Sequence, residues 1–345
     1  MNSTHDDDVI ITNGFIIFEI VIRLLLALTG TMGNTFVIYA VVMTPKLRTV
    51  PNAFVTTVAL LDLVACGILV PLMVFSTVDN EWPFGVKLCR AHGFTLILFH
   101  ALSLNILGLI ALNRFLNITK PLHVYRKFAT PHLFVLQIAG AIIVAGVPVL
   151  SPLFGIGDVN FVGFNPILGH CTFGFDVEGV WTYQVVLLSL GLIIGIVVIP
   201  FNYIMIYKHV GASRSRVHAW QGSTFPKPPG SRFSEQRAHS DVCSRSHEGS
   251  LPVFHFAIPS RRNMHRDNIR LTRNLWLLFF TYMLSIIPFF LFVFFDRDYE
   301  LPAWLWRTVD ILLWSTSTAN PYLYAWMTSS FREAFRKLIY NCSSP

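Results

Sequence analysis

Four polar residues stand inside long apolar stretches of this chain, where such side chains are rare. Asp62 and Asp310 bring carboxylates to these stretches, Arg114 brings a guanidinium to the end of one, and Asn320 brings an amide beside Pro321. Charged and polar groups are costly in lipid, so they face the protein interior, pair or become hydrated, and mark functional sites. The proline also frees a backbone carbonyl that finds no water there. We therefore expect these residues to hold an ion, a ligand or a movable polar contact.

The chain as a whole has the composition of a membrane protein. Its 345 residues are 53% hydrophobic and only 13% charged, and the mean hydropathy of +0.56 is too high for a soluble protein of this size. Seven segments reach the roughly 20 residues that a helix needs to cross a bilayer: Phe15–Met43, Asn52–Val78, Cys89–Phe115, Pro131–Leu153, Trp181–His209, Ile269–Phe295 and Trp304–Trp326. Because the sequence lacks the alternation of a membrane barrel, we predict an all-α membrane protein, a bundle of seven transmembrane helices.

The distribution of charge predicts the orientation in the plasma membrane. With the amino terminus (residues 1–14) outside, the outer segments are acidic and most of the 26 Lys and Arg residues fall on the cytoplasmic side. This asymmetry obeys the positive-inside rule. The pI near 9.3 then reflects a cytoplasmic face beside anionic lipid, and nucleic acid need not be invoked. Asn2 begins the only glycosylation sequon on the outer side.

Two cytoplasmic segments accompany the seven-helix domain, residues 15–326. Residues 211–267 are rich in Ser, Arg, His, Pro and Gly without a helical period, so we predict a disordered third intracellular loop. Residues 327–345 are predicted to form a short amphipathic helix on the inner leaflet, followed by the cytoplasmic tail. Cys342 follows this helix and is a candidate for palmitoylation, with an unmodified tail cysteine as the equal alternative.

The predicted location of each remaining cysteine indicates whether it is oxidised or reduced. Cys89 lies at the outer end of the third span and Cys171 in the loop after the fourth, so both fall outside, where oxidation is expected. A disulfide between them would pin that loop over the mouths of the helices. Cys66 lies in a span and Cys243 in the cytosol, so both are expected to stay reduced.

Several spaced motifs carry a resemblance to a known family. They are Gly33-Asn34, Leu60-Leu61-Asp62-Leu63, Trp82-Pro83-Phe84-Gly85, Asn113-Arg114-Phe115, Pro121-Leu122, Pro200, Pro288 and Asn320-Pro321-Tyr322-Leu323-Tyr324. In this order and register they resemble the rhodopsin-like (class A) G-protein-coupled receptors, over essentially the whole chain. The Asn113-Arg114 pair and the Cys171-Thr172-Phe173 stretch are distantly similar to the melatonin-receptor branch and its orphan relatives.

The resemblance implies a function. It implies a receptor, not an enzyme, that binds an extracellular ligand and activates heterotrimeric G proteins, with arrestin and a receptor kinase as further partners. The alternative is a seven-helix protein that binds ligand without coupling, as a scavenger or arrestin-biased receptor. No cofactor is implied, apart from one allosteric ion.

That ion is sodium, and the resemblance places it beside Asp62. In this family Asn34, Ser103, Ser317 and Asn320 converge on the corresponding acid, and such a cluster of oxygens suits a hydrated sodium ion that stabilises the inactive state. The alternative is a protonated Asp62 in an ordinary hydrogen-bond network.

The resemblance also assigns a cytoplasmic switch. Arg114, with Phe115 beside it, is the group that meets the G protein, and Tyr324 swings towards it on activation. Pro288 and Pro321 weaken the helices that move. The alternative for Arg114 is an anchor at the positive inner surface.

Departures from the family pattern affect this switch. Asn113 replaces the usual acid beside Arg114, so the local salt bridge is missing and we predict a looser inactive state with basal signalling. The stretch Ser285-Ile286-Ile287-Pro288 lacks the usual tryptophan toggle. Tyr207 lies seven residues after Pro200, one short of the family's usual spacing, and we assign it to the switch with its role open.

A ligand cavity is expected at the outer mouth of the bundle. Helical spacing predicts that it is lined by His92, Leu96, Ile97 and His100 of the third span, Phe289, Phe290 and Val293 of the sixth, and Trp306, Asp310 and Trp314 of the seventh. Asp310 either holds a cationic ligand group or pairs with Arg23 of the first span. Leu96 stands where amine receptors carry an aspartate, and Trp314 stands at the retinal-attachment position. The resemblance therefore argues against an amine receptor and against an opsin.

The ligand class is predicted from charge and from the cavity walls. The acidic outer face would steer cationic ligands towards the mouth, which favours a basic peptide first. The apolar and aromatic walls favour a lipid-like or small aromatic molecule as the second choice.

Overall fold

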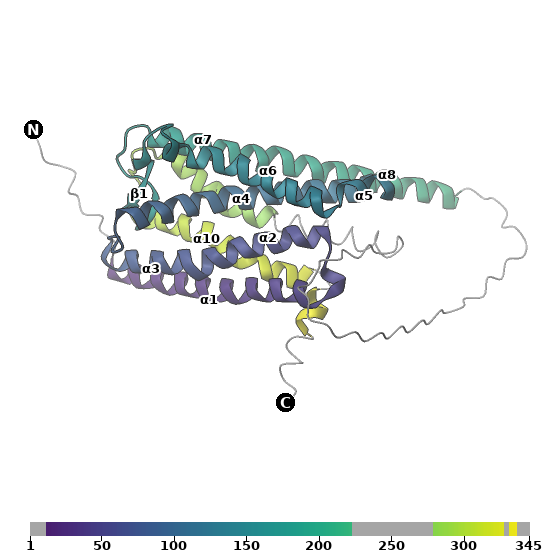
Figure 1. Ribbon diagram of the computed structural model, residues 1–345, viewed down its shortest axis with the longest axis horizontal. Helices are drawn as coiled ribbons and strands as arrows, with labels where there is room; N and C mark the ends of the chain where they lie inside the picture. The colour runs from purple at the N-terminus through teal and green to yellow at the C-terminus, as the bar shows by residue number, and fades with distance from the viewer. Residues whose placement is uncertain (1–11, 223–278, 328–330, 337–345) are drawn as a thin grey trace, which may run out of the picture.

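The computed structural model describes residues 12–222, 279–327 and 331–336, and Figure 1 shows their helices running side by side in one elongated bundle. Its longer elements are α1 (Asn13–Met43), α2 (Val50–Val64), α3 (Val70–Asp79), α4 (Val86–Thr119), α5 (Leu122–Phe128), α6 (Pro131–Leu150), α7 (Val180–Leu192), α8 (Ile199–Gly222), the helix Phe279–Phe295 and α10 (Ala303–Met327). Short 3₁₀ turns lie at Pro45–Leu47, Ser151–Phe154 and Val159–Phe161.

The predicted spans correspond to these helices. Five of the described segments are long and apolar enough to cross a membrane: Asn13–Met43, Val50–Asp79, Val86–Thr119, Pro131–Phe154 and Val180–Ala212. Phe279–Phe295 is a shorter apolar helix, because residues 223–278 lie outside the described part of the chain. The last helix, α10, has 25 residues but contains Arg307 and Asp310. The predicted all-α bundle is confirmed.

Two of the spans contain a wide helical turn. Ala65–Leu69 (η2) joins α2 to α3, and Ile193–Val198 (η5) joins α7 to α8, both as π-helix. Each is followed two residues later by a proline, Pro71 or Pro200, whose ring cannot fit a regular α-helical turn. A π turn uses an extra residue, so it rotates the side chains that follow and is often found at functional sites.

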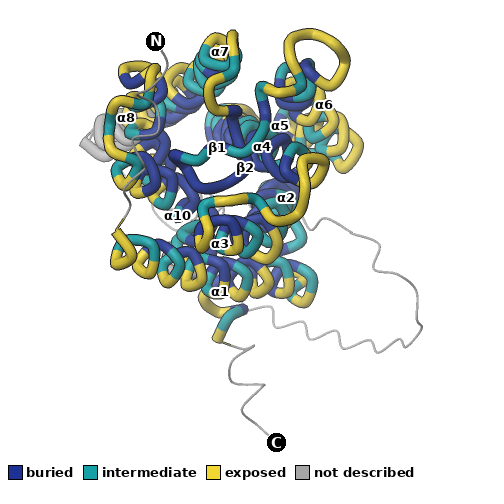
Figure 2. The backbone as a smooth tube through the Cα atoms, turned by 90° about the vertical axis from the view of Figure 1, so that its left-hand side faces the viewer, coloured by how far each residue is buried: buried dark blue, intermediate teal, exposed yellow. Residues whose placement is uncertain are grey.

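One element was not predicted from the sequence. Between α6 and α7 the chain forms an antiparallel hairpin of β1 (Val162–Asn165) and β2 (His170–Phe173). Figure 2 shows this hairpin lying across the middle of the ring of helices, with β2 in the colour of buried residues and the middle of β1 in that of half-buried ones. The predicted disulfide is confirmed, because Cys171 of β2 is bonded to Cys89 of α4.

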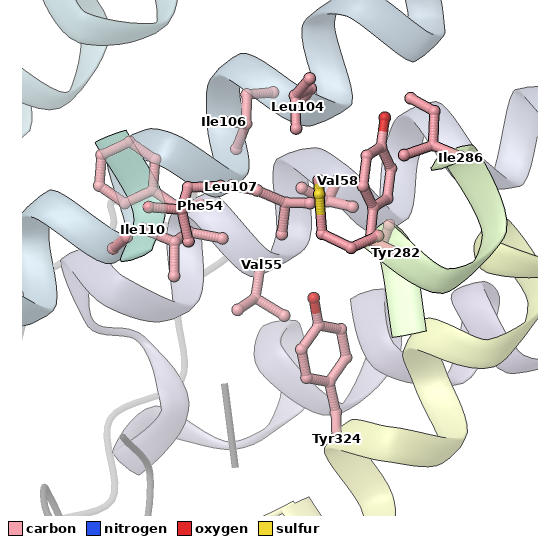
Figure 3. Close-up of a cluster of buried hydrophobic side chains, with 14 of the residues drawn as sticks. Phe54, Val55, Val58, Leu104, Ile106, Leu107, Ile110, Tyr282, Ile286 and Tyr324 are labelled. Atoms are coloured by element: carbon pink, nitrogen blue, oxygen red, sulfur yellow. The ribbon is translucent and has the colours of Figure 1, made fainter. Parts of the chain in front are cut away.

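The core of the bundle is centred on α4, which packs against α2, α6, α8 and both strands. Figure 3 shows part of this core, in which Leu107 and Ile110 of α4, Val55 of α2 and Tyr282 of the helix Phe279–Phe295 belong to one cluster. Tyr324 of α10 lies at the edge of the same cluster, with its hydroxyl directed inwards. The buried apolar stripes of four spans thus meet on one central helix.

The cytoplasmic end partly corrects the sequence-based predictions. Helix α8 continues to Gly222, so the expectation of disorder was wrong for residues 211–222. Residues 331–336 are helical, and the rings of Phe331 and Tyr324 stack 6.1 Å apart, as an amphipathic helix requires. The predictions for residues 223–267, Asn2 and Cys342 lie outside the described residues.

Candidate functional site

An apolar cavity lies beneath the hairpin. It has a volume of about 400 Å³ and is bounded by α4, α6, α7, η5, the helix Phe279–Phe295 and α10. The predicted residues that line it are Leu96, Ile97, His100, Phe289, Asp310 and Trp314. The imidazole of His100 bonds the Leu96 carbonyl of its own helix, and its ring lies edge-on to Trp314, with centroids 4.5 Å apart. His100 is therefore both a hydrogen-bonded core residue and part of the wall.

Four predicted residues lie outside this cavity, each for a visible reason. The ring nitrogens of His92 bond the carbonyls of Leu69 and Cys171, so this side chain ties α4 to its neighbours. The Trp306 indole donates to Asp296 Oδ2 at 2.7 Å, above the cavity. Phe290 stacks on the outward-facing ring of Phe294, and Val293 belongs to the buried core. The prediction that these four line the cavity was wrong.

Sequence reasoning missed two walls of the cavity. Val144, Ala145 and Pro148 come from α6, and Leu187, Gly191 and Ile194 come from α7 and η5. These are apolar or small residues in uniformly apolar helices, so no sequence signal separates them from lipid-facing neighbours. The roof, formed by His170, Thr172 and Phe173 of β2, was missed with the hairpin itself.

A buried network of four charges closes the outer end of the bundle. Arg23 of α1 donates to Asp310 Oδ2 at 2.9 Å and to Glu19 Oε1 at 2.9 Å. Arg307 of α10 donates to Glu19 Oε2 at 3.1 Å. All four side chains are at most 4% exposed. Two acids and two bases therefore neutralise one another, and Asp310 forms the pair with Arg23 that was one of its two predicted roles.

The same network holds the hairpin. Arg307 donates from Nε to the Ile167 carbonyl at 3.0 Å and from a terminal nitrogen to the Pro166 carbonyl at 3.2 Å. Gly169 closes this turn with a φ of +72°, and a Cβ there would lie 2.8 Å from the Arg307 guanidinium carbon. The turn thus requires glycine both for its backbone conformation and for the close approach of the arginine.

His170 of β2 lies beside this network but is not one of its charges. Its Nε2 is 3.8 Å from Asp310 Oδ1, a carboxylate already held by Arg23. Burial, and then the positive charge of Arg23 and the neighbouring His92, lower the pKa of His170 well below its usual value. His170 is therefore neutral, and its Nδ1 bonds the Leu168 carbonyl at 3.0 Å.

A small polar pocket lies deeper in the bundle, at the predicted sodium site. It holds about 20 Å³, which is room for one water molecule or one ion, and Asp62, Ser103, Ser317 and Asn320 line it. The Asn320 amide donates to Asp62 Oδ2 at 2.8 Å. Asn34 was predicted to join this cluster, but its amide donates to the carbonyls of Gly30 and Ser317 instead. The oxygens of the acid and the two serines fit a small cation.

The cytoplasmic end contains a second buried charge with different surroundings. Arg114 is 5% exposed, and its Nε has no hydrogen-bond partner in the part of the chain that the structure describes. Among the residues that the structure describes, no carboxylate forms a salt bridge with Arg114. Its neighbour Asn113 accepts a hydrogen bond from Tyr125 at 3.4 Å, where an acid would have paired with the arginine.

Two tyrosines of α8 differ in their surroundings. Tyr207 is 80% exposed on α8 and points away from the bundle, whereas Tyr203 is 3% exposed and interacts electrostatically with Arg114. Tyr324 is buried, and its hydroxyl has no partner among the described atoms. Pro288 and Pro321 lie within their helices as predicted, and Phe115 packs against the core.

Comparison with known proteins agrees with this architecture. A family model described as 7 transmembrane receptor (rhodopsin family) matches residues 33–324. G-protein coupled receptor 84 of Mus musculus is 26% identical, covering 94% of this chain and 93% of that protein. The Gq-coupled rhodopsin of Mizuhopecten yessoensis is 30% identical over 63% of this chain and 43% of that protein. The crystal structure of squid rhodopsin matches with a TM-score of 0.73 at 18% identity, covering 97% of this chain and 89% of that chain.

Proposed function

This chain belongs to the rhodopsin family of seven-transmembrane receptors, and from that premise we propose that its ligand is a largely apolar, lipid-like or small aromatic molecule. Members of the family are multi-pass receptors of the plasma membrane that bind extracellular ligands and signal through G proteins. The ligand class goes beyond family membership. It replaces the basic peptide that the acidic outer face favoured.

The observation that carries this proposal is the pairing of Asp310. A cationic ligand would need a free carboxylate in the cavity, but Asp310 is held by Arg23 at 2.9 Å. The other predicted wall residues in contact with the cavity are apolar or aromatic, apart from His100. An apolar cavity with few polar groups favours an apolar ligand, because leaving a buried charge without a partner is costly.

A nucleotide-exchange assay tests the proposal. The full-length receptor in lipid nanodiscs would be screened against lipid-like molecules, small aromatic molecules and basic peptides, with a panel of heterotrimeric G proteins as the readout. Hits from the first two classes should lose at least tenfold in potency in Ile286→Trp, which fills the cavity. The matched variant Ile287→Trp changes the neighbouring residue, which faces outwards and does not line the cavity. Hits confined to basic peptides would contradict the proposal.

We also propose that Arg114 and Tyr324, with Tyr203 in place of Tyr207, form the surface that meets the G protein. The supporting observation is that Tyr203 interacts electrostatically with both Arg114 and Tyr324, so the three groups lie together. Arrestin and a receptor kinase are the further partners that the resemblance implies. Ligand-dependent recruitment of arrestin with no nucleotide exchange on any G protein would favour the non-coupling alternative.

The polar pocket at Asp62 is proposed to bind a sodium ion that stabilises the inactive state. Asp62, Ser103 and Ser317 would supply the oxygens. Replacing sodium chloride with choline chloride at equal ionic strength should lower the melting temperature of the ligand-free receptor and raise its basal exchange. Asp62→Asn should abolish both effects, whereas Asp79→Asn, at an exposed acid on α3, should keep them. An equal response to both salts in the unmodified receptor would contradict the site.

A further inference from the structure

The ligand cavity is covered on its extracellular side by β2. All four residues of this strand are buried, and three of them form the cavity roof. The disulfide to Cys89 holds one end of the strand on α4. Gly93 of α4 lies directly beneath, since a Cβ there would be 2.5 Å from Val162 Cγ1. The strands therefore rest on α4 with no space between them for a ligand.

The other end of the hairpin is also held, by hydrogen bonds. The Pro166–Gly169 turn receives hydrogen bonds from Arg307, and Ser76 of α3 donates to the Gly169 carbonyl at 2.7 Å. Lifting this turn would remove partners from a buried arginine, which is energetically expensive. Figure 2 shows the result, a hairpin with a fully buried β2 that spans the mouth between helices on opposite sides. Entry from water through the roof would require these contacts to break.

The side of the cavity facing the lipid is different. Val144 of α6, Leu190 of α7 and Ile193 of η5 line the cavity and are also 59%, 46% and 55% exposed on the outside of the bundle. A side chain that meets both the cavity and the outer surface marks an opening between them. Both α6 and α7 pack on α4 rather than closely on each other. At their outer ends the Tyr183 hydroxyl donates to the Val149 carbonyl, so the gap lies below a closed rim.

The depth of this gap places it in the outer leaflet. Val144 lies six residues before the end of α6 at Leu150, and Leu190 lies ten residues after the start of α7 at Val180. At 1.5 Å per residue these positions are about 9–15 Å below the outer ends of the helices. That depth is within the outer half of a hydrocarbon core about 30 Å thick. The side chains at the edge of this gap are apolar. An alkyl chain that passes between them therefore separates no charged or polar protein group from its partner.

We propose that the gap between α6 and the α7–η5 segment is a lateral portal, through which a lipid-like ligand enters the cavity from the outer leaflet. This inference rests on the proposed function, because it assumes a ligand that dissolves in the bilayer. It assigns a role to Val144, Leu190 and Ile193 that the family resemblance does not. The hairpin is then a fixed roof, and the membrane is the compartment from which the ligand is drawn.

Photolabelling in nanodiscs tests the portal. The probe is an alkyl alcohol carrying a diazirine, which partitions into the bilayer, and mass spectrometry measures the rate at which Leu104 and Ile286, deep in the cavity, become labelled. Val144→Trp and Leu190→Trp narrow the portal and should each slow this labelling at least tenfold. Val147→Trp and Val186→Trp add the same bulk at outward-facing positions outside the cavity, on the same two helices. They should label at the wild-type rate.

A widened portal provides the opposite change, which keeps the test valid if a tryptophan variant folds poorly. The double variant Val144→Ala/Leu190→Ala should label faster than wild type. Wild-type labelling rates in the narrowed variants, or unchanged rates in the widened one, would overturn the portal while leaving the apolar ligand class intact. A wild-type cavity that takes up no probe would overturn the ligand class together with the portal.

Discussion

The two ends of the bundle both contain buried charged side chains, but within the described ranges these charges are paired only at one end. At the outer end, Glu19, Arg23, Arg307 and Asp310 form a closed set of two acids and two bases, each paired at 2.9–3.1 Å. At the opposite end, which is predicted to face the cytoplasm, Arg114 is buried to a similar degree, but its Nε has no partner among the described residues and its neighbour is an asparagine. Burial is therefore common to both ends, and the difference lies in the partners.

From this difference we predict which half of the receptor is fixed and which half moves. Separating a buried ion pair leaves two charges without partners, so the outer network holds α1, α10 and the hairpin in a single arrangement. Moving an arginine that pairs with no described acid breaks no ion pair, so the cytoplasmic end can change at low cost. A fixed ligand cavity coupled to a movable inner end is what a transmembrane receptor requires.

The largest expected effect on stability comes from breaking the charge network at the outer end. Arg23→Met leaves Asp310 without its partner and Glu19 with only Arg307, in surroundings that exclude water. Loss of one partner from a buried pair costs about 3–5 kcal/mol. We expect the melting temperature in detergent to fall by on the order of 10 °C.

A second substitution sharpens this prediction. Arg23→Met/Asp310→Asn removes the orphaned acid and leaves the Glu19–Arg307 pair intact, so it should recover most of the lost stability. Lys87→Met, at an exposed basic residue of α4, should leave the melting temperature unchanged. If Arg23→Met were no more harmful than Lys87→Met, the outer end would not be held by its charges.

The next largest effect is expected when the buried arginine at the inner end, Arg114, is given a carboxylate partner like those at the outer end. Asn113→Asp places a carboxylate beside Arg114, and a new pair that stabilises the inactive state by about 1.4 kcal/mol would lower ligand-free nucleotide exchange about tenfold. Asn113→Ala is the control, because it removes the hydrogen bond from Tyr125 without adding charge. Equal exchange in Asn113→Asp and the unmodified receptor would contradict the role assigned to the missing acid.

The sequence predicted the helices well, because they depend on local information. Long apolar stretches identify spans wherever they occur, and the cysteines in outer segments indicated the Cys89–Cys171 bond that the structure contains. The predicted pairing of Asp310 with Arg23 came from comparing their depths in neighbouring spans. The distant similarity to the melatonin-receptor branch, and the assigned roles in switching and ion binding, stay predictions.

What the sequence could not give depends on how helices rotate and which loops fold back. The hairpin is specified by long-range contacts to Arg307 and Ser76, which no local pattern reveals. Val144 and Leu190 could not be told from ordinary lipid-facing residues, because all their neighbours are apolar too. Trp306 and His92 were placed on the correct helices but pair with Asp296 and backbone carbonyls outside the cavity.

A smaller effect on stability is expected from His170, the neutral histidine beside the charge network at the outer end. The pKa of His170 is lowered by burial and by Arg23 and His92, whereas its hydrogen bond to the Leu168 carbonyl and the charge of Glu19 on α1 oppose this shift only weakly. Because the folded state resists protonation, the stability from neutral His170 is complete above the usual pKa near 6.5 and is lost as the pH falls below it. Lowering the pH from 7.5 to 5.5 should cost about 1 kcal/mol of stability.

The matched variant for this test is His170→Asn, which keeps a polar side chain but cannot titrate in this range. Its melting temperature should fall less between pH 7.5 and pH 5.5 than that of the unmodified receptor. Identical pH profiles for the two proteins would show that protonation elsewhere, and not at the hairpin, governs acid stability.

A stability effect of similar size separates Tyr203 from Tyr207, the tyrosine that the sequence assigned to the switch. The residues of α8 that face the bundle include Asn202, Tyr203 and Ile206, at helical spacing after the π turn, and Tyr207 falls one position beyond this face. Tyr203→Phe removes a hydroxyl that interacts with Arg114 and should lower stability by about 1 kcal/mol, or roughly 2–4 °C in melting temperature. Tyr207→Phe should change neither stability nor exchange. A change in stability or exchange in Tyr207→Phe, and not in Tyr203→Phe, would contradict this orientation of α8. Tyr207 would then be the tyrosine that faces Arg114.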